Sequence, residues 1–115
     1  MDSKTLERMY PELYTMFGGY FNQDYRTITE GFDDSKPVIP QLTNVYKNDC
    51  NKEQLAATIK ELEDLINMHY TEDVIRTITY EFSMWININY YGYTYKQFLR
   101  EILQILKDEQ YRPID

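Results

Sequence analysis

The stretch NKEQLAATIKELEDLIN, residues 51–67, carries the clearest helical pattern in this sequence. Its apolar residues recur at the spacing of one helix face, whereas charged residues occupy the other side. The apolar face comprises Leu55, Ile59, Leu62, Leu65 and Ile66. Asn51 is a suitable N-cap, and Glu53 stands in the first turn, where the helix dipole favours an acidic side chain. The pattern predicts an amphipathic helix packed on one side against the rest of the chain.

Further helical patterns precede this stretch. Pro11 begins one of them, at a position where its missing N–H costs nothing. The pair Gly18–Gly19 interrupts its apolar face, and we interpret the pair as a point of close packing against another element. Pro40 begins a shorter predicted helix, which gives way to a break over residues 48–51. A single helical turn is expected over residues 4–9.

The C-terminal half contains two more predicted helices and one extended stretch. Thr71 and Thr94 are placed to cap the two helices. Residues 85–93 begin with an alternation of apolar and polar residues, which predicts an extended loop docked through its aromatic side chains. The sequence therefore predicts an all-α single domain over residues 1–115, with about five helices and an extended aromatic loop before the last one.

Composition limits the classes of function. The chain has 115 residues, a formal net charge of −7 and one cysteine, Cys50. Such acidity disfavours binding to nucleic acid, which needs clustered lysine and arginine, and suits a basic protein partner. One cysteine excludes an internal disulfide framework. The N-terminus shows no secretion signal, and no apolar run has the roughly 20 residues of a membrane helix, so we expect a soluble cytoplasmic protein.

No constellation of catalytic or metal-binding residues is evident. His69 is the single histidine, and its position near a helix C-terminus predicts an interaction with the helix dipole. One histidine and one cysteine are too few for a zinc site. The sequence contains neither a phosphate-binding glycine loop nor an EF-hand. We predict no catalytic residue, no cofactor and no metal, although the abundant carboxylates leave a two-carboxylate hydrolase open.

Two clusters are candidates for contact with a partner. The first is an acidic loop, which either is simply solvated or mimics nucleic-acid phosphates toward a basic partner. The second is a run of tyrosines, a residue type common in cores and enriched at interfaces. The candidate partner-binding residues are Glu30, Asp33, Asp34, Tyr90, Tyr91 and Tyr93.

The stretch YPELYTMFGGYFNQDY, residues 10–25, resembles the opening of a family of bacterial contact-dependent growth inhibition immunity proteins, the CdiI type. That family typically opens with aromatic-Pro-x-Leu, continues through Phe, a small-residue pair and Tyr-Phe, and closes with Gln-Asp and an aromatic residue. Residues 90–99 are similar to its aromatic pair, loop and closing helix, with Phe98 where the family usually has Trp. Residues 26–50 depart from the pattern, as a specificity region would.

The resemblance implies a helical, non-enzymatic, cytoplasmic protein that binds and neutralises the C-terminal toxin domain of a cognate effector. Many such toxins are nucleases with basic substrate clefts, so we expect occlusion of the toxin active site by an acidic surface. The two clusters above are expected to bind the toxin, and the shared motif to hold the fold. The motif residues are Tyr20, Gln23, Asp24 and Tyr25. The alternative is another acidic antitoxin, an anti-restriction protein or a nucleic-acid mimic, and the choice between monomer and dimer stays open.

Overall fold

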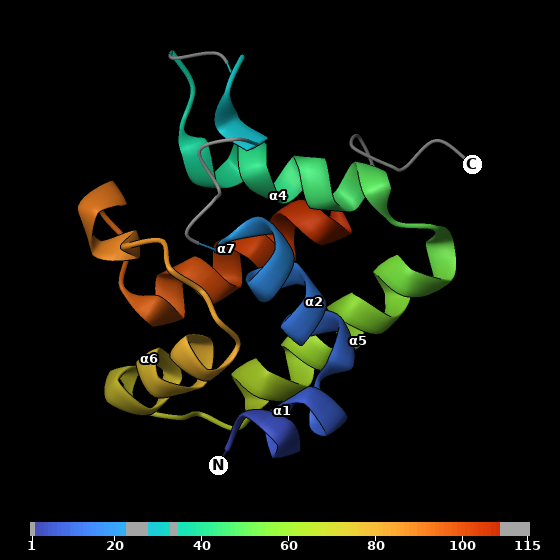
Figure 1. Cartoon of the computed structure of the whole chain (residues 1–115), viewed down its shortest axis with the longest axis vertical. Helices are drawn as coiled ribbons and strands as arrows, with labels where there is room; N and C mark the ends of the chain where they lie inside the picture. The colour runs from blue at the N-terminus through green and yellow to red at the C-terminus, as the bar shows by residue number, and fades with distance from the viewer. Residues whose placement is uncertain (1, 23–27, 33–34, 109–115) are drawn as a thin grey trace.

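Helices make up nearly all the regular structure of the chain (Figure 1). The computed structural model describes residues 2–22, 28–32 and 35–108, and this part contains no strand. Its elements are α1 (Ser3–Met9), α2 (Pro11–Tyr20), α4 (Val38–Asp49), α5 (Lys52–Asn67), α6 (Glu72–Glu81), the 3₁₀ turn η1 (Ile88–Tyr91) and α7 (Tyr95–Lys107). The predicted all-α fold is confirmed, with six α-helices in the described part where about five were expected. None of these helices is both long and apolar enough to cross a membrane.

The predicted capping residues begin their helices. The Asn51 side chain accepts a hydrogen bond from the Gln54 N–H at 2.7 Å at the start of α5. Thr71 accepts one from the Val74 N–H at 3.3 Å at the start of α6. Thr94 forms a capping box at the start of α7. Its side chain accepts a hydrogen bond from the Gln97 N–H, and the Gln97 side chain accepts one from the Thr94 N–H.

Two predicted boundaries are wrong. The turn expected over residues 4–9 is a complete helix, α1, because Asp2 caps it by accepting from the Thr5 N–H at 2.8 Å. The short helix expected from Pro40 begins earlier, at Val38, and continues to Asp49 through residues predicted to be a break. A proline is tolerated there because N–H groups of the first helical turn have no partner within the helix.

The core centres on an aromatic cluster between α2, α7 and the end of α6. Its four rings are fully buried: Phe17, Phe21, Phe82 and Phe98. Phe17 contacts the other three, with ring centroids 5.7, 5.8 and 6.0 Å apart. Truncating a ring packed this way to alanine costs about 3–5 kcal/mol. α7 lies in the middle of Figure 1 and contacts α4, α5 and α6, so the cluster joins the two ends of the chain.

The two glycines of α2 differ in their surroundings. A Cβ at Gly18 would lie 2.9 Å from the carbonyl oxygen of Phe82, whereas a Cβ at Gly19 would meet nothing within 4 Å. The interpretation of close packing is therefore confirmed at Gly18 and wrong at Gly19. At Gly18 the missing side chain lets α2 approach the backbone that follows α6.

The stretch before α7 is extended at its start, as predicted. Docking through aromatic side chains is confirmed for Tyr91 and Tyr93, which pack against the core, but not for Trp85 and Tyr90, which are exposed. Met84, Ile86 and Ile88 are buried, while the residues between them are exposed, so aliphatic side chains hold the first half of the segment. The Phe21 carbonyl also accepts hydrogen bonds from the N–H groups of residues 85 and 86, at 2.8 and 3.3 Å. The segment then ends in η1 and in Gly92, whose φ of 88° favours glycine.

Candidate partner-binding surface

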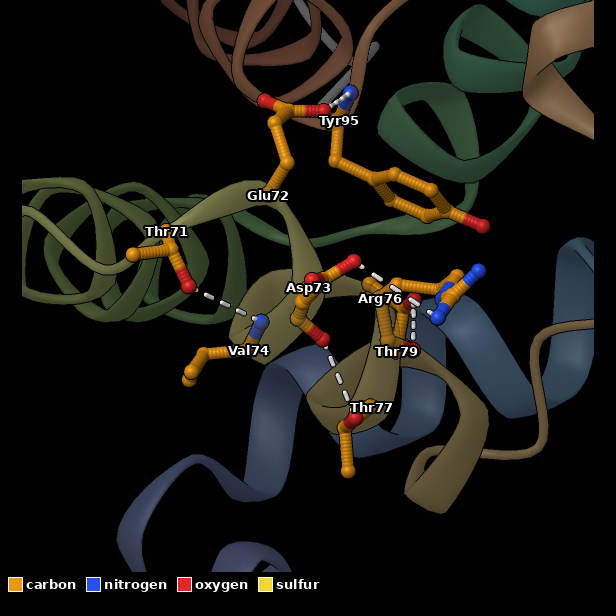
Figure 2. A network of polar contacts seen from close by, with 8 residues as sticks. All are labelled: Thr71, Glu72, Asp73, Val74, Arg76, Thr77, Thr79 and Tyr95. Atoms are coloured by element: carbon orange, nitrogen blue, oxygen red, sulfur yellow. Dashed lines mark hydrogen bonds and ion pairs between the residues drawn. The ribbon is translucent and has the colours of Figure 1, made fainter.

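Several charged side chains inside the fold hold helix ends. The Glu72 carboxylate accepts hydrogen bonds from the N–H groups of Tyr95 and Lys96, at 2.7 and 2.9 Å, and so caps α7 from α6. Figure 2 shows this contact to Tyr95 beside an exposed ion pair in which Asp73 and Arg76 lie 3.6 Å apart. A carboxylate at a helix N-terminus satisfies unpaired N–H groups and complements the helix dipole.

Two further charges act in the same way. Glu61 of α5 accepts hydrogen bonds from the N–H groups of Glu12 and Leu13, at 2.9 and 3.1 Å, at the start of α2. Burial raises the pKa of Glu61, and these two hydrogen bonds oppose that rise. Lys47 of α4 is 1% exposed, and its ammonium donates to the carbonyls of Ile105, at 2.8 Å, and of Asp108 at the end of α7. These groups join helices that are distant in sequence.

One residue of the predicted family motif, Tyr20, lies within the described part. Its hydroxyl donates to the Asp49 carboxylate at 2.7 Å, and its ring packs edge-on against Tyr46 with centroids 5.0 Å apart. Burial, followed by the hydrogen bond to Asp49, raises the pKa of Tyr20. Tyr20 thus connects α2 to α4. The other motif residues, Gln23, Asp24 and Tyr25, lie outside the described residues.

The predicted acidic loop is described in part. Glu30 is exposed and stands before Gly31, which has a φ of 91°. Asp33 and Asp34 lie outside the described residues.

The three predicted tyrosines are exposed to different degrees. Tyr90 is 80% exposed, and Tyr91 is half-buried and packs edge-on against it with centroids 5.1 Å apart. Tyr93 is half-buried against Phe98, at 6.2 Å between ring centroids. Burial, followed by hydrogen bonding to the Glu101 carboxylate and its negative charge, raises the pKa of Tyr93. Tyr90 is therefore the member of the cluster that offers the most free surface.

Two exposed aromatic residues were missed by the sequence reasoning. Tyr80 on α6 is 68% exposed, and Trp85 in the extended segment is 61% exposed. The signal for Trp85 was present, because an alternation that buries residues 84, 86 and 88 turns residue 85 outward. With Tyr90 they are the exposed aromatic side chains of the described residues 80–90, and we name this set the aromatic edge: Tyr80, Trp85 and Tyr90.

The remaining nucleophilic and metal-binding candidates are structural. His69 is exposed, with a φ of 55°, and its N–H donates to the Ile66 carbonyl at 3.1 Å. It ends α5 through its backbone, a role that the prediction of a dipole interaction did not include. Cys50 is buried, and burial raises the pKa of its thiol, which disfavours the reactive thiolate. Within the described ranges, no three potential ligand side chains come together to hold a metal ion.

This arrangement is that of a small all-α protein, in which buried and half-buried charges join the helices and aromatic side chains remain on the surface. The family within that class follows from sequence comparison. The model of the family described as CdiI immunity protein matches residues 9–106, and the chain belongs to this family. Comparisons with curated proteins and with solved structures find no match. Membership implies a toxin-neutralising immunity protein that binds a cognate toxin protein.

Proposed function

We propose that this protein binds the C-terminal toxin domain of a contact-dependent growth inhibition effector, a nuclease with a basic substrate cleft, and occludes its active site. It acts as a single domain, residues 1–115, in the cytoplasm of the cell that makes it. Family membership supports the toxin as the partner. The formal net charge of −7 supports a basic partner, because opposite charges accelerate encounter and favour the correct orientation.

The aromatic edge is the observation that carries the proposal. Tyrosine and tryptophan are enriched among the few residues that dominate binding energy at protein interfaces. Residues 85 and 90 are at most about 17 Å apart along an extended chain, so both fit within one interface patch of roughly 800 Å² per partner. The buried residues on either side of Trp85 hold its backbone in place before any partner arrives. Such preorganisation limits the entropy lost on binding.

The predicted clusters extend this surface. Tyr91 and Tyr93 lie one and three residues after Tyr90 and continue the proposed contact toward α7. Glu30, Asp33 and Asp34 are proposed to meet basic residues of the toxin, since acidic side chains complement a cleft that binds phosphates. Tyr20, with Gln23, Asp24 and Tyr25, is proposed to hold the fold, and the hydrogen bond from Tyr20 to Asp49 supports that role for Tyr20.

Co-expression tests the proposal. The C-terminal domain encoded by the gene immediately upstream is induced with and without this protein, while growth and the integrity of tRNA, rRNA and DNA are followed. Death relieved by this protein supports immunity, and the nucleic acid that is cut identifies the reaction. If the domain still kills with the protein in excess, the pairing proposed for this locus is wrong.

Variants of the aromatic edge test its role. Trp85→Ala and Tyr90→Ala are each expected to weaken toxin binding by about 2 kcal/mol, roughly 30-fold, with little change in folding. Met68→Ala is the matched control, because Met68 is also exposed, at 51%, but lies at the end of α5. Equal effects of all three variants on affinity would contradict the role of the aromatic edge.

A further inference from the structure

A hollow lies between the tyrosine cluster and α7. It has a volume of about 470 Å³ and opens to solvent. Its lining residues are Gly92, Tyr93, Gln97, Arg100, Glu101 and Gln104. Tyr90 and Tyr91 precede Gly92 in the chain, so the hollow adjoins the surface proposed to meet the toxin.

The Glu101 carboxylate interacts with the Tyr93 hydroxyl, but one of its two oxygens is left without a partner. This oxygen, Oε2, is buried and has no hydrogen-bond partner among the described residues. The carboxylates of Glu61 and Glu72, by contrast, each accept two backbone hydrogen bonds. A buried acceptor without a partner is unfavourable, because it has lost water without a compensating bond. A donor from another molecule would remove this deficit.

We infer that Glu101 receives an arginine side chain of the toxin domain, which enters the hollow beside Tyr93. This inference rests on the proposed function. A guanidinium matches a carboxylate with two parallel hydrogen bonds, stacks on aromatic rings and is less strongly hydrated than an ammonium group. The terminal torsion of glutamate is soft, so either carboxylate oxygen can turn toward the hollow. The arginine would donate the missing hydrogen bond to the Glu101 carboxylate and pair its own positive charge with the negative charge of Glu101.

Arg100 also lines this hollow and has the same charge as the proposed guest. It neighbours Glu101 on α7, and adjacent residues of a helix do not face each other. No ion pair between these two side chains is found in the part of the chain that the structure describes. Because Arg100 repels an incoming cation, Arg100→Gln is expected to tighten toxin binding severalfold.

The central test is Glu101→Gln, which keeps the shape of the side chain and removes its charge. Affinity for the upstream-encoded toxin domain is measured by calorimetry, and stability by thermal unfolding of the free protein. We expect binding to weaken about 30-fold or more, as when one partner of a buried charge pair is removed. The unfolding midpoint is expected to stay the same or rise, because the free protein loses an unsatisfied buried charge. A residue that only holds the fold would give the opposite stability change.

Glu63→Gln is the matched control, since it changes the net charge equally. Glu63 already pairs with Lys107 at 3.4 Å, so we expect less than a threefold change in affinity. Alanine replacement of each toxin arginine, measured with wild-type protein and with Glu101→Gln, identifies the guest as the arginine whose effect disappears in the variant.

The outcomes separate the two proposals. Wild-type protein that neither binds nor rescues contradicts the proposed function itself. Wild-type protein that rescues, with Glu101→Gln and Glu63→Gln equal in affinity, overturns the inference alone. A lower unfolding midpoint for Glu101→Gln, or coupling to a toxin lysine instead of an arginine, also overturns it.

Discussion

Alanine at the two adjacent glycines of α2 should change stability in opposite directions. Replacing glycine by alanine inside a helix stabilises it by about 0.5–1 kcal/mol, because the unfolded chain loses conformational freedom. At Gly19 a methyl group meets nothing within 4 Å, so Gly19→Ala should show this gain. At Gly18 the methyl would lie 2.9 Å from the Phe82 carbonyl oxygen. Overpacking of this kind costs about 1–3 kcal/mol, which exceeds the gain and leaves a net loss of up to about 2.5 kcal/mol.

The Phe82 carbonyl cannot simply move away from a new methyl group. The Phe82 ring is fully buried and packs on Phe17 with centroids 5.7 Å apart, and its N–H donates to the Ile78 carbonyl at 3.0 Å. Thermal and urea unfolding, followed by circular dichroism, measure both variants under one buffer. A difference of about 2 kcal/mol between them corresponds to roughly 8 °C in Tm for a chain of this length. Equal shifts in the same direction would refute the close approach at Gly18.

Three further changes test the contacts between helices. Tyr20→Phe removes the hydrogen bond to Asp49 and should lower the free energy of unfolding, measured by urea titration, by about 1–2 kcal/mol. An unchanged free energy would contradict a structural role for this hydrogen bond. Lys47→Met leaves the carbonyls at the end of α7 without their donor, so hydrogen exchange in the last turn of α7 should accelerate; unchanged exchange would contradict this cap. Because the pKa of Glu61 is raised in the folded state, its ionisation opposes folding. Wild-type protein should therefore lose stability relative to Glu61→Gln as the pH rises from 4 to 7. Unfolding midpoints of both proteins, measured across this range, test this. A difference in midpoint that does not vary with pH would contradict the raised pKa of Glu61.

The helix starts were predictable because their chemistry is local. Asn51, Thr71 and Thr94 each accept from a backbone N–H three residues ahead, and such a contact forms whatever the rest of the chain does. The start of α4 was missed because proline is compatible with any position of a first helical turn, so Pro40 marks the turn without fixing its first residue.

The contacts across the fold could not be read from sequence. Glu61 lies 49 residues from the N–H it caps at Glu12, and Lys47 lies 58 residues from the carbonyl at Ile105. Nothing near these residues marks them as different from exposed charges of other helices. The burial of Tyr93 could not be predicted for the same reason, because it depends on where Phe98 of α7 lies.

The described structure divides its side chains between two tasks. Charged side chains such as the buried Lys47 and the half-buried Glu61 and Glu72 are satisfied within the chain, so changing one alters the fold before it alters a surface. The aromatic edge makes no such contribution, because its aliphatic neighbours hold the segment. Affinity for a partner can therefore change at Tyr80, Trp85 and Tyr90 without loss of stability. Glu101 belongs to neither group, since its Oε2 atom is buried like a structural group and yet lacks a partner in the described chain. The toxin arginine that we propose for the hollow would give this oxygen its hydrogen bond in the complex, so Glu101 would serve affinity and not the fold.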